Sequence, residues 1–201
     1  MKNSIFNPDN QNRNLSSKIV AGLERISESF KVLLWDKAKM LGISPIQIQI
    51  LIFIAYHKTS FCNVSNLAKE FNLMKATISD AVKVMSRKEL ITKHYNSKDT
   101  RSYNILLSEE GKRIVNETEN FANPIKDQLG EISESDLKNL FETLSKLIHQ
   151  LNQNGILTVQ RTCYACNFYR KNKNTDYCNL LNKELLNSDI RLDCPEFEKS
   201  K

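Results

Sequence analysis

The sequence predicts a mainly helical fold with a small β component: a winged helix-turn-helix flanked by long helices and followed by a small cysteine module. Three observations predict it. Apolar residues recur every three or four positions over most of residues 15–154, which is the period of amphipathic helices. The period changes to two between residues 91 and 108, which is typical of strands. Four of the five cysteines lie in the segment 155–201.

The N-terminal helices come first. Residues 1–14 are polar and are expected to be disordered. A long helix is predicted over residues 15–41, and Gly42 is a suitable C-terminal stop. The stretch SPIQ beginning at Ser44 then supplies the serine cap, the first-turn proline and the glutamine of a capping box. The helix that it begins is nearly all apolar through Tyr56, so we expect that helix to be buried.

A short helix, a turn and a second helix follow, and they form a helix-turn-helix pattern within a core at about residues 44–107. Asn63 can cap the short helix VSNLAKEF, and a turn around Asn72 leads to KATISDAVKVMSRKEL. In this second helix Ile78 and Met85 belong to an apolar face that packs on the protein. The opposite face is polar and points outward. Its candidate DNA-contacting residues are Lys75, Ala76, Thr77, Ser79, Asp80, Lys83 and Arg87.

The two strand-like segments form the added wing. ITKHYNS and YNILLS are joined by the charged turn SKDTR. Lys98 and Arg101 in this turn are placed to reach phosphates or the adjacent minor groove. Asp99 and Arg101 are expected to form an ion pair that shapes the wing.

Two further helices are predicted after the wing. The first begins at Ser108 with acidic residues in its first turn, and Pro124 should kink it. The second covers about residues 134–153 and carries a leucine seam from Leu137 to Leu151, which is suited to packing against a partner chain. A lone winged helix does not need these extra amphipathic helices, so a dimer is expected.

Charge and composition narrow the class of function. The net charge is +6, and residues 75–101 hold 7 basic and 3 acidic side chains, whereas residues 108–154 hold 5 and 9. Positive charge on the helix-turn-helix favours nucleic acid as a partner. The sequence has neither a membrane-length apolar run nor a signal peptide, so we expect a cytoplasmic, nucleoid-associated protein with no membrane partner. We find no phosphate-binding glycine loop and no catalytic triad, and we expect no enzymatic activity.

Residues 15–154 resemble the MarR family of transcriptional regulators. The matching positions are Leu67-Ala68, Thr77-Ile78-Ser79, Leu90-Ile91, Asp99-Thr100-Arg101 and Leu107-Ser108-Glu109-Glu110-Gly111. The resemblance implies a homodimer that binds double-stranded DNA at a palindromic operator. The candidate DNA-binding set thus comprises the residues of the second helix together with the wing residues Lys98 and Arg101. Two positions depart from the family pattern: Asp80 stands where a basic residue is common, and Met74 replaces a small polar N-cap.

The segment 155–201 carries the remaining chemistry. Cys163 and Cys166 are two residues apart, Cys178 follows after 11 residues, and Cys194 after another 15. Four thiolates suffice for one metal ion or one iron–sulfur cluster; two disulfides or four unrelated thiols are the alternatives. The Cys194-Pro195 pair and the surrounding aromatic residues favour a [4Fe–4S]-type cluster over Zn(II).

Three functions are compatible with these observations. The leading one is a homodimeric repressor whose four-cysteine centre responds to redox state or metal supply. The second is a regulator with a structural zinc and a small-molecule effector bound between the dimer helices and the winged domain. The third is an electron-transfer component. Outside these sites, Cys62 is interpreted as a small buried thiol, His57 as a core residue, and His94 and His149 as surface residues.

Overall fold

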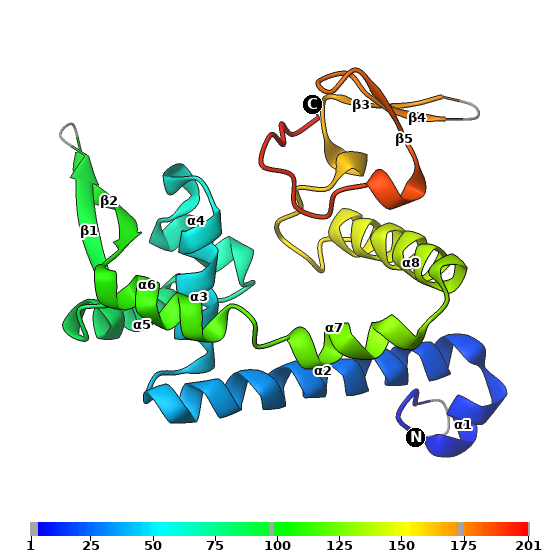
Figure 1. The fold of residues 1–201 in the computed structure, drawn as a ribbon, viewed down its shortest axis with the longest axis horizontal. Coiled ribbons are helices and arrows are strands. Elements are labelled where there is room, and N and C mark those ends of the chain that lie inside the picture. Colours follow the sequence, from blue (N-terminus) through cyan, green and yellow to red (C-terminus); the bar gives the residue numbers. More distant parts are fainter. Residues whose placement is uncertain (1–3, 97–98, 173–174, 201) are drawn as a thin grey trace.

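The chain consists of a winged head, a set of long helices and a C-terminal cysteine module (Figure 1). The computed structural model describes residues 4–96, 99–172 and 175–200, and the side chains of residues 96–101 lie outside the described part. The head contains α3 (Pro45–Tyr56), η1 (Thr59–Phe61), α4 (Val64–Glu70), α5 (Lys75–Arg87), β1 (Ile91–Asn96), β2 (Asp99–Leu107) and α6 (Glu109–Thr118). The predicted mainly helical winged-helix class is confirmed.

The N-terminal part differs from the expectation of disorder over residues 1–14. It contains a short helix, α1 (Pro8–Arg13), whose N-terminus is capped by the Asn7 side chain, which accepts a hydrogen bond from the backbone N–H of Asp9. The long helix α2 (Leu15–Leu41) follows, and it ends at Gly42, whose φ of 62° lies in the left-handed region that favours glycine. Only Leu34 and Ala38 of α2 are buried.

The head is built around α3, as predicted. The backbone N–H of Ser44 donates to the side chain of Gln47 at 2.9 Å, which confirms the capping box. Ile50 and Leu51 are fully buried and form one core with apolar residues of α4, α5, α6 and both strands. This core holds the outer elements of the head against α3.

The wing is an antiparallel hairpin. Ile91 pairs with Leu107 and the register continues to Tyr95 and Tyr103, after which a shift occurs at Asn96. Strand β2 begins at Asp99, earlier than the segment YNILLS predicted, because its pairing extends into the charged turn.

The prediction of one helix kinked at Pro124 was wrong. The helix ends at Thr118 and a new one, α7 (Asn123–Gln128), begins with proline in its first turn. Proline is favoured there because the first helical N–H groups have no partner within the helix. The short η2 (Leu129–Glu131) and the predicted helix α8 (Glu134–Gln153) follow.

The cysteine module packs on α8 (Figure 1). It contains η3 (Cys163–Ala165), β3 (Tyr169–Lys171), β4 (Asp176–Cys178), β5 (Lys183–Leu185) and η4 (Asn187–Asp189). The three strands form one antiparallel sheet in chain order. Its buried apolar cluster is small: it consists of Cys163, Leu185 and Ile190, with Phe141 of α8 packed against them.

Within the described residues, no single helix has both the length and the apolar content needed to cross a membrane. Only α2 and α3 taken together reach both, and a bend of 94° separates them.

Candidate nucleic-acid interface and cysteine site

The head presents α5 outward by burying one of its faces. Ile78, Val82 and Met85 have no exposed surface, and Ala81 is nearly buried. Helix α4 packs against α5. The Asn63 side chain caps α4 by accepting from the backbone N–H of Asn66 at 3.0 Å. The turn between the two helices includes Asn72, whose φ of 54° lies in the left-handed region, and this turn changes the direction of the chain before α5.

The predicted contact residues of α5 form one outward face. Lys75, Ala76, Thr77, Asp80, Lys83 and Arg87 are exposed, and Ser79 is half-buried. The Lys83 ammonium lies 2.9 Å from the Asp80 carboxylate. An exposed pair of this kind contributes roughly 0 to 1 kcal/mol, so it can rearrange when a charged partner approaches. The acid at position 80 therefore has a local cation to pair with.

Helix α5 begins at Lys75, with Met74 in the N-cap position. The Met74 side chain is 74% exposed and makes no capping hydrogen bond. The first N–H groups of a helix need an acceptor from outside the helix. The departure from the family pattern at Met74 therefore leaves this end of α5 without a side-chain acceptor.

The wing lies beside α5, and its paired part carries aromatic and basic side chains. The Lys93 ammonium lies 4.9 Å from the centre of the Tyr103 ring, and the Tyr95 and Tyr103 rings are 5.5 Å apart. Lys98 lies outside the described residues, as do the side chains of Asp99 and Arg101. The expected ion pair and DNA contacts of the wing tip therefore stay predictions.

The junction between the wing and α6 is closely packed. A β-carbon at Gly111 would lie 2.0 Å from the carbonyl oxygen of Leu90, so only glycine fits there. Ser108 caps α6 by accepting from the Gly111 N–H at 3.0 Å and donates to the carbonyl of Glu89 at 2.5 Å. This packing explains why the motif that ends the wing carries a glycine three residues after the serine.

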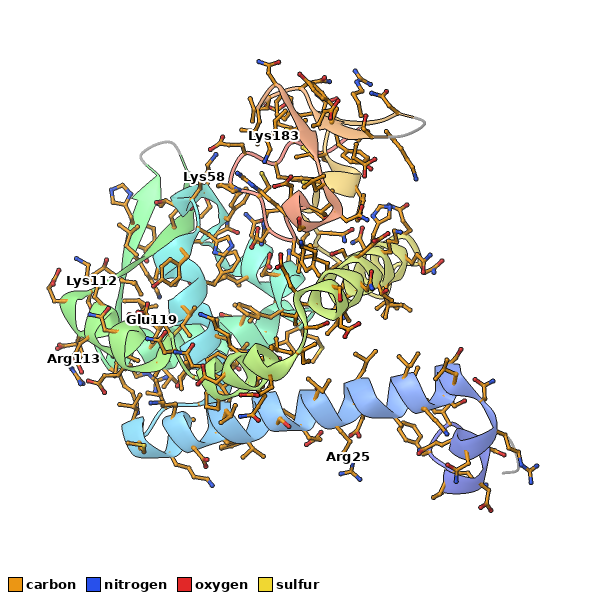
Figure 2. The ribbon with its side chains drawn as sticks, turned by 45° about the vertical axis from the view of Figure 1, so that its right-hand side comes forward. Arg25, Lys58, Lys112, Arg113, Glu119 and Lys183 are labelled. Atoms are coloured by element: carbon orange, nitrogen blue, oxygen red, sulfur yellow. The ribbon has the colours of Figure 1, made fainter. Side chains whose placement is uncertain are left out.

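The long helix α2 leaves much of its apolar surface uncovered. Arg25 projects from the length of α2 that extends away from the head (Figure 2). On the same helix eight large apolar side chains are at least 40% exposed: Leu15, Ile19, Val20, Ile26, Phe30, Val32, Trp35 and Met40. Such a surface on one protomer is typical of a helix that packs against another chain.

The four tail cysteines gather around one cavity. Cys163, Cys166, Cys178 and Cys194 all line a space of about 40 Å³, and all four are free thiols. About 10–15 Å³ admits one water molecule, so the space admits a metal ion. Within the described residues, however, no three His, Cys, Asp or Glu side chains are positioned to hold a metal ion. The four thiols therefore line one cavity without forming the geometry of a metal site.

Hydrogen bonds from Arg191 reach two of these sulfur atoms. Its backbone N–H donates to Cys163 Sγ at 3.2 Å, and its guanidinium lies 3.7 Å from Cys194 Sγ. Burial raises the pKa of the Cys163 thiol, the Arg191 N–H opposes this shift, and the three nearby thiols add to it. A bound cation would reverse that balance, because a coordinating thiol is deprotonated.

A buried arginine joins the cysteine module to the head. Arg161 is 9% exposed. Its guanidinium donates to both carboxylate oxygens of Glu70 at 2.8 and 3.0 Å, and its Nε donates to Asp193 at 2.5 Å. It also lies over the rings of Phe53 and Phe61. Lys58, which pairs with Glu196, lies in the same region (Figure 2).

His57 completes this contact between the head and the tail. Its Nε2 lies 2.8 Å from Asp193 Oδ2, and its ring stacks on Phe53 with 3.7 Å between the ring centres. Burial would raise the pKa of Asp193, but hydrogen bonds from Arg161 and His57 outweigh burial and lower it. His57 is thus half-buried at an interface rather than in a core. Sequence reasoning missed Arg161, Glu70 and Asp193, because nothing in the pattern links positions so far apart.

A cleft of about 1020 Å³ lies between the head, the end of α8 and the tail. Its walls include Lys69, Tyr164 and Gln160. The side-chain nitrogen of Gln160 is buried and makes no hydrogen bond within the described part of the chain, while its oxygen lies 3.2 Å from His149 Nδ1. His149 is therefore half-buried at this cleft rather than a surface residue.

Residues 41–102 match the sequence model of the MarR family. The winged head is therefore similar to the MarR family in sequence. The matched segment runs from the end of α2 into β2, so it covers the helix-turn-helix and most of the wing. No curated protein matches the chain.

Solved structures share this fold. The DNA complex of MepR from S. aureus has 22% identity and a TM-score of 0.58, over 66% of this chain and 97% of that one. A MarR/EmrR family transcriptional regulator from Acinetobacter sp. ADP1 has 26% identity and a TM-score of 0.56, over 70% and 99%. The regulator BldR from Sulfolobus solfataricus has 20% identity and a TM-score of 0.53, over 66% and 94%. The names of the Acinetobacter and Sulfolobus proteins describe them as transcriptional regulators.

Proposed function

We propose that the chain is a DNA-binding transcriptional regulator that acts as a homodimeric repressor at a palindromic operator. One observation carries this proposal: α5 buries its apolar face and presents a polar face beside a basic wing. That is how a winged helix-turn-helix places its second helix in the major groove. The fold shared with MepR, which has been solved in complex with DNA, supports it.

The side chains of α5 divide into two roles in this proposal. Lys75, Lys83 and Arg87 are exposed cations that would neutralise phosphates, and such contacts position the protein without reading sequence. Thr77, Ser79 and Asp80 would face base edges, where a carboxylate can accept from the cytosine amino group. Ala76 can approach a thymine methyl group, and Lys98 and Arg101 would hold the wing on the backbone or in the minor groove.

The exposed side of α2 supports the proposed homodimer. Leu15, Ile19, Ile26 and Phe30 recur at steps of four and seven residues, so they form one stripe along the helix. In water such a stripe needs a partner, and a second copy with the same stripe provides one. The two α5 helices of such a dimer would then enter successive major grooves, roughly 34 Å apart.

The test is selection of DNA from a random-sequence duplex pool by the full-length protein. A palindromic consensus with two half-sites about one helical turn apart is the expected result. Its binding should weaken steeply with salt, because phosphate contacts release counterions. Recovery of no consensus, together with binding that is equal on all duplexes, would contradict sequence-specific regulation.

We further propose that the four tail cysteines hold one metal centre, with a [4Fe–4S]-type cluster favoured over Zn(II). The gathering of four free thiols around one cavity, with an N–H donor to Cys163, supports it. An iron–sulfur cluster would supply a redox-sensitive charge, and zinc would supply only a structural crosslink. Cys163, Cys166, Cys178 and Cys194 would turn inward to bind it.

The metal proposal is tested by metal analysis and visible absorption of anaerobically purified protein. Cys178→Ser should remove the bound metal, whereas Cys62→Ser is a matched control because Cys62 is buried in the head. Colourless protein with one zinc per chain would identify a structural staple. Wild-type protein that binds neither metal would refute the proposal.

The large cleft beside Gln160 favours a second regulatory candidate, a small-molecule effector. The cleft is lined by the Gln160 amide nitrogen, a buried donor without an acceptor in the described part of the chain, and by Lys69. In this alternative the tail centre is structural zinc. A compound that changes operator affinity in wild-type protein, but not after Gln160→Leu, would support it.

A further inference from the structure

The cysteine module contacts the helix-turn-helix through a largely buried ion pair between Arg161 and Glu70. Arg161 donates two hydrogen bonds to Glu70, the last residue of α4, and two to Asp193. The exposed fraction of the side chain is 10% for Arg161 and 21% for Glu70. A charge pair in this environment is costly to break, because each partner would remain poorly solvated. The position of Arg161 and the position of Glu70 are therefore linked.

The tail end of this link lies next to two of the cysteines in the sequence. Asp193 immediately precedes Cys194, and Arg161 lies two residues before Cys163. The backbone N–H of Cys194 donates to the Arg161 carbonyl at 3.0 Å, and the N–H of Cys163 donates to the Arg191 carbonyl at 3.2 Å. The two segments that carry the ion pair are thus the same two segments that a centre bound by Cys163 and Cys194 would hold together.

The head end of the link lies at the turn before α5. After Glu70, the backbone N–H groups of Phe71, Asn72 and Leu73 donate to carbonyls of α4, at 3.0, 3.2 and 2.9 Å. Further contacts hold the same place: Thr158 donates to the carbonyl of Lys69, and Asn72 donates to the carbonyl of Ile156 at 3.5 Å. The tail therefore binds the end of α4 and the turn that follows it. This turn leads into α5, so it determines the orientation of α5.

We propose that the Arg161–Glu70 pair couples the state of the four-cysteine centre to the orientation of the recognition helix α5. The inference rests on the proposed regulator function and names its mode of control. When the centre is bound, Arg161 and Asp193 are fixed and hold Glu70. When the centre is lost, only a small apolar cluster stabilises the fold of the tail. The contact between Arg161 and Glu70 of α4 is then released.

The test uses full-length protein, prepared anaerobically, with Zn(II) as the probe and chelator-treated protein as the stripped form. Glu70→Ala removes the head end of the pair, leaves Arg161 paired with Asp193, and places a good helix former in α4. Lys58→Ala is the matched control, because Lys58 joins Glu196 across the same interface, 3.4 Å apart, but both side chains are more than half exposed.

The first measurement is amide hydrogen exchange at Phe71, Asn72 and Leu73, which needs no DNA. In wild type and in Lys58→Ala, removal of Zn(II) should speed exchange by about tenfold, within the usual range of coupling between sites. In Glu70→Ala the exchange should be fast with or without Zn(II), while Zn(II) content stays at the wild-type value. A wild-type protein that binds no Zn(II), or a full metal effect in Glu70→Ala, would overturn the inference.

The second measurement is affinity for a duplex selected by wild-type protein, at one fixed salt concentration. The ratio between Zn(II)-bound and stripped protein should be about tenfold for wild type and close to one for Glu70→Ala. An unchanged ratio in Glu70→Ala would overturn the coupling but leave the regulator proposal standing. Absence of DNA binding by every form would overturn the proposed function, and the exchange data would still decide the coupling.

Discussion

Replacement of Gly111 by alanine tests whether the joint between the wing and α6 is as tightly packed as the structure shows. The added carbon would lie 2.0 Å from the Leu90 carbonyl oxygen, whereas ordinary contact begins at 3.4 Å. The two segments must therefore separate by more than 1 Å. Overpacking of this kind costs about 3 kcal/mol.

Two smaller effects accompany the clash and nearly cancel. Separation would weaken the hydrogen bonds from Ser108 to the carbonyls of Leu90 and Glu89, which would lower the free energy of unfolding by about 1 kcal/mol. The higher helix propensity of alanine returns about 1 kcal/mol. The net loss is about 3 kcal/mol, which corresponds to a melting temperature lower by about 6–12 °C in a chain of this size.

The assay is denaturant unfolding followed by circular dichroism, at one protein concentration because a dimer is stabilised by mass action. Gly130→Ala is the matched control, since a β-carbon at Gly130 meets nothing within 4 Å and the change should stay within about 1 kcal/mol. If Gly111→Ala unfolds at the same denaturant concentration as wild type, the close approach to Leu90 is not a constraint and the reasoning fails.

Three further outcomes are expected. Arg87→Gln should weaken binding to all duplexes alike and lower the slope of log affinity against log salt by about 0.9, as measured by fluorescence anisotropy, whereas Lys126→Gln in α7 should leave the slope unchanged. Ile26→Asp on the exposed stripe of α2 should convert the dimer to a monomer in sedimentation velocity, and a variant that remains dimeric would exclude this interface. Burial raises the pKa of the Cys62 thiol from 9.0 to about 11; between these values the unfolded chain releases a proton that the folded chain keeps, so stability should fall as pH rises through that window. At about pH 8 Cys62 should resist alkylation, and labelling as fast as that of a free thiol would show that it is not buried.

The winged head was predictable because its signals are local. These signals are capping residues, a turn residue and a change in the period of apolar residues from about four to two. Each acts within a few positions, and together they predict the elements from α3 to β2. The short helix at Pro8 carried a comparable signal, since Asn7 is a cap and proline is favoured in the first turn. It was missed because the polar composition was interpreted as disorder. Pro124 was likewise interpreted as a kink, although it marks a helix start.

The cysteine module was predictable only in part. The spacing of Cys163 and Cys166 indicates a common site, and the structure does gather all four thiols around one cavity. The strands β3 to β5 have three residues each, too short for any periodicity. The pairing of Glu70 with Arg161 depends on packing between parts of the chain 91 residues apart. No sequence pattern encodes such a contact, because it arises only when both parts have folded.

The ion pair between Glu70 and Arg161 joins parts of the chain that are far apart in sequence. This separation determines when the contact can form during folding. The head is complete once Thr118 at the end of α6 has been made, but its contact with the tail needs Asp193, 75 residues later. At a synthesis rate of about 5–20 residues per second, that interval lasts about 4–15 s. Each new chain thus has a finished head before it has the contact that grips α4. Non-local contacts of this kind also carry the largest loop-closure cost. We therefore expect the contact between Glu70 and Arg161 to form last and to be the first that mild destabilisation would release.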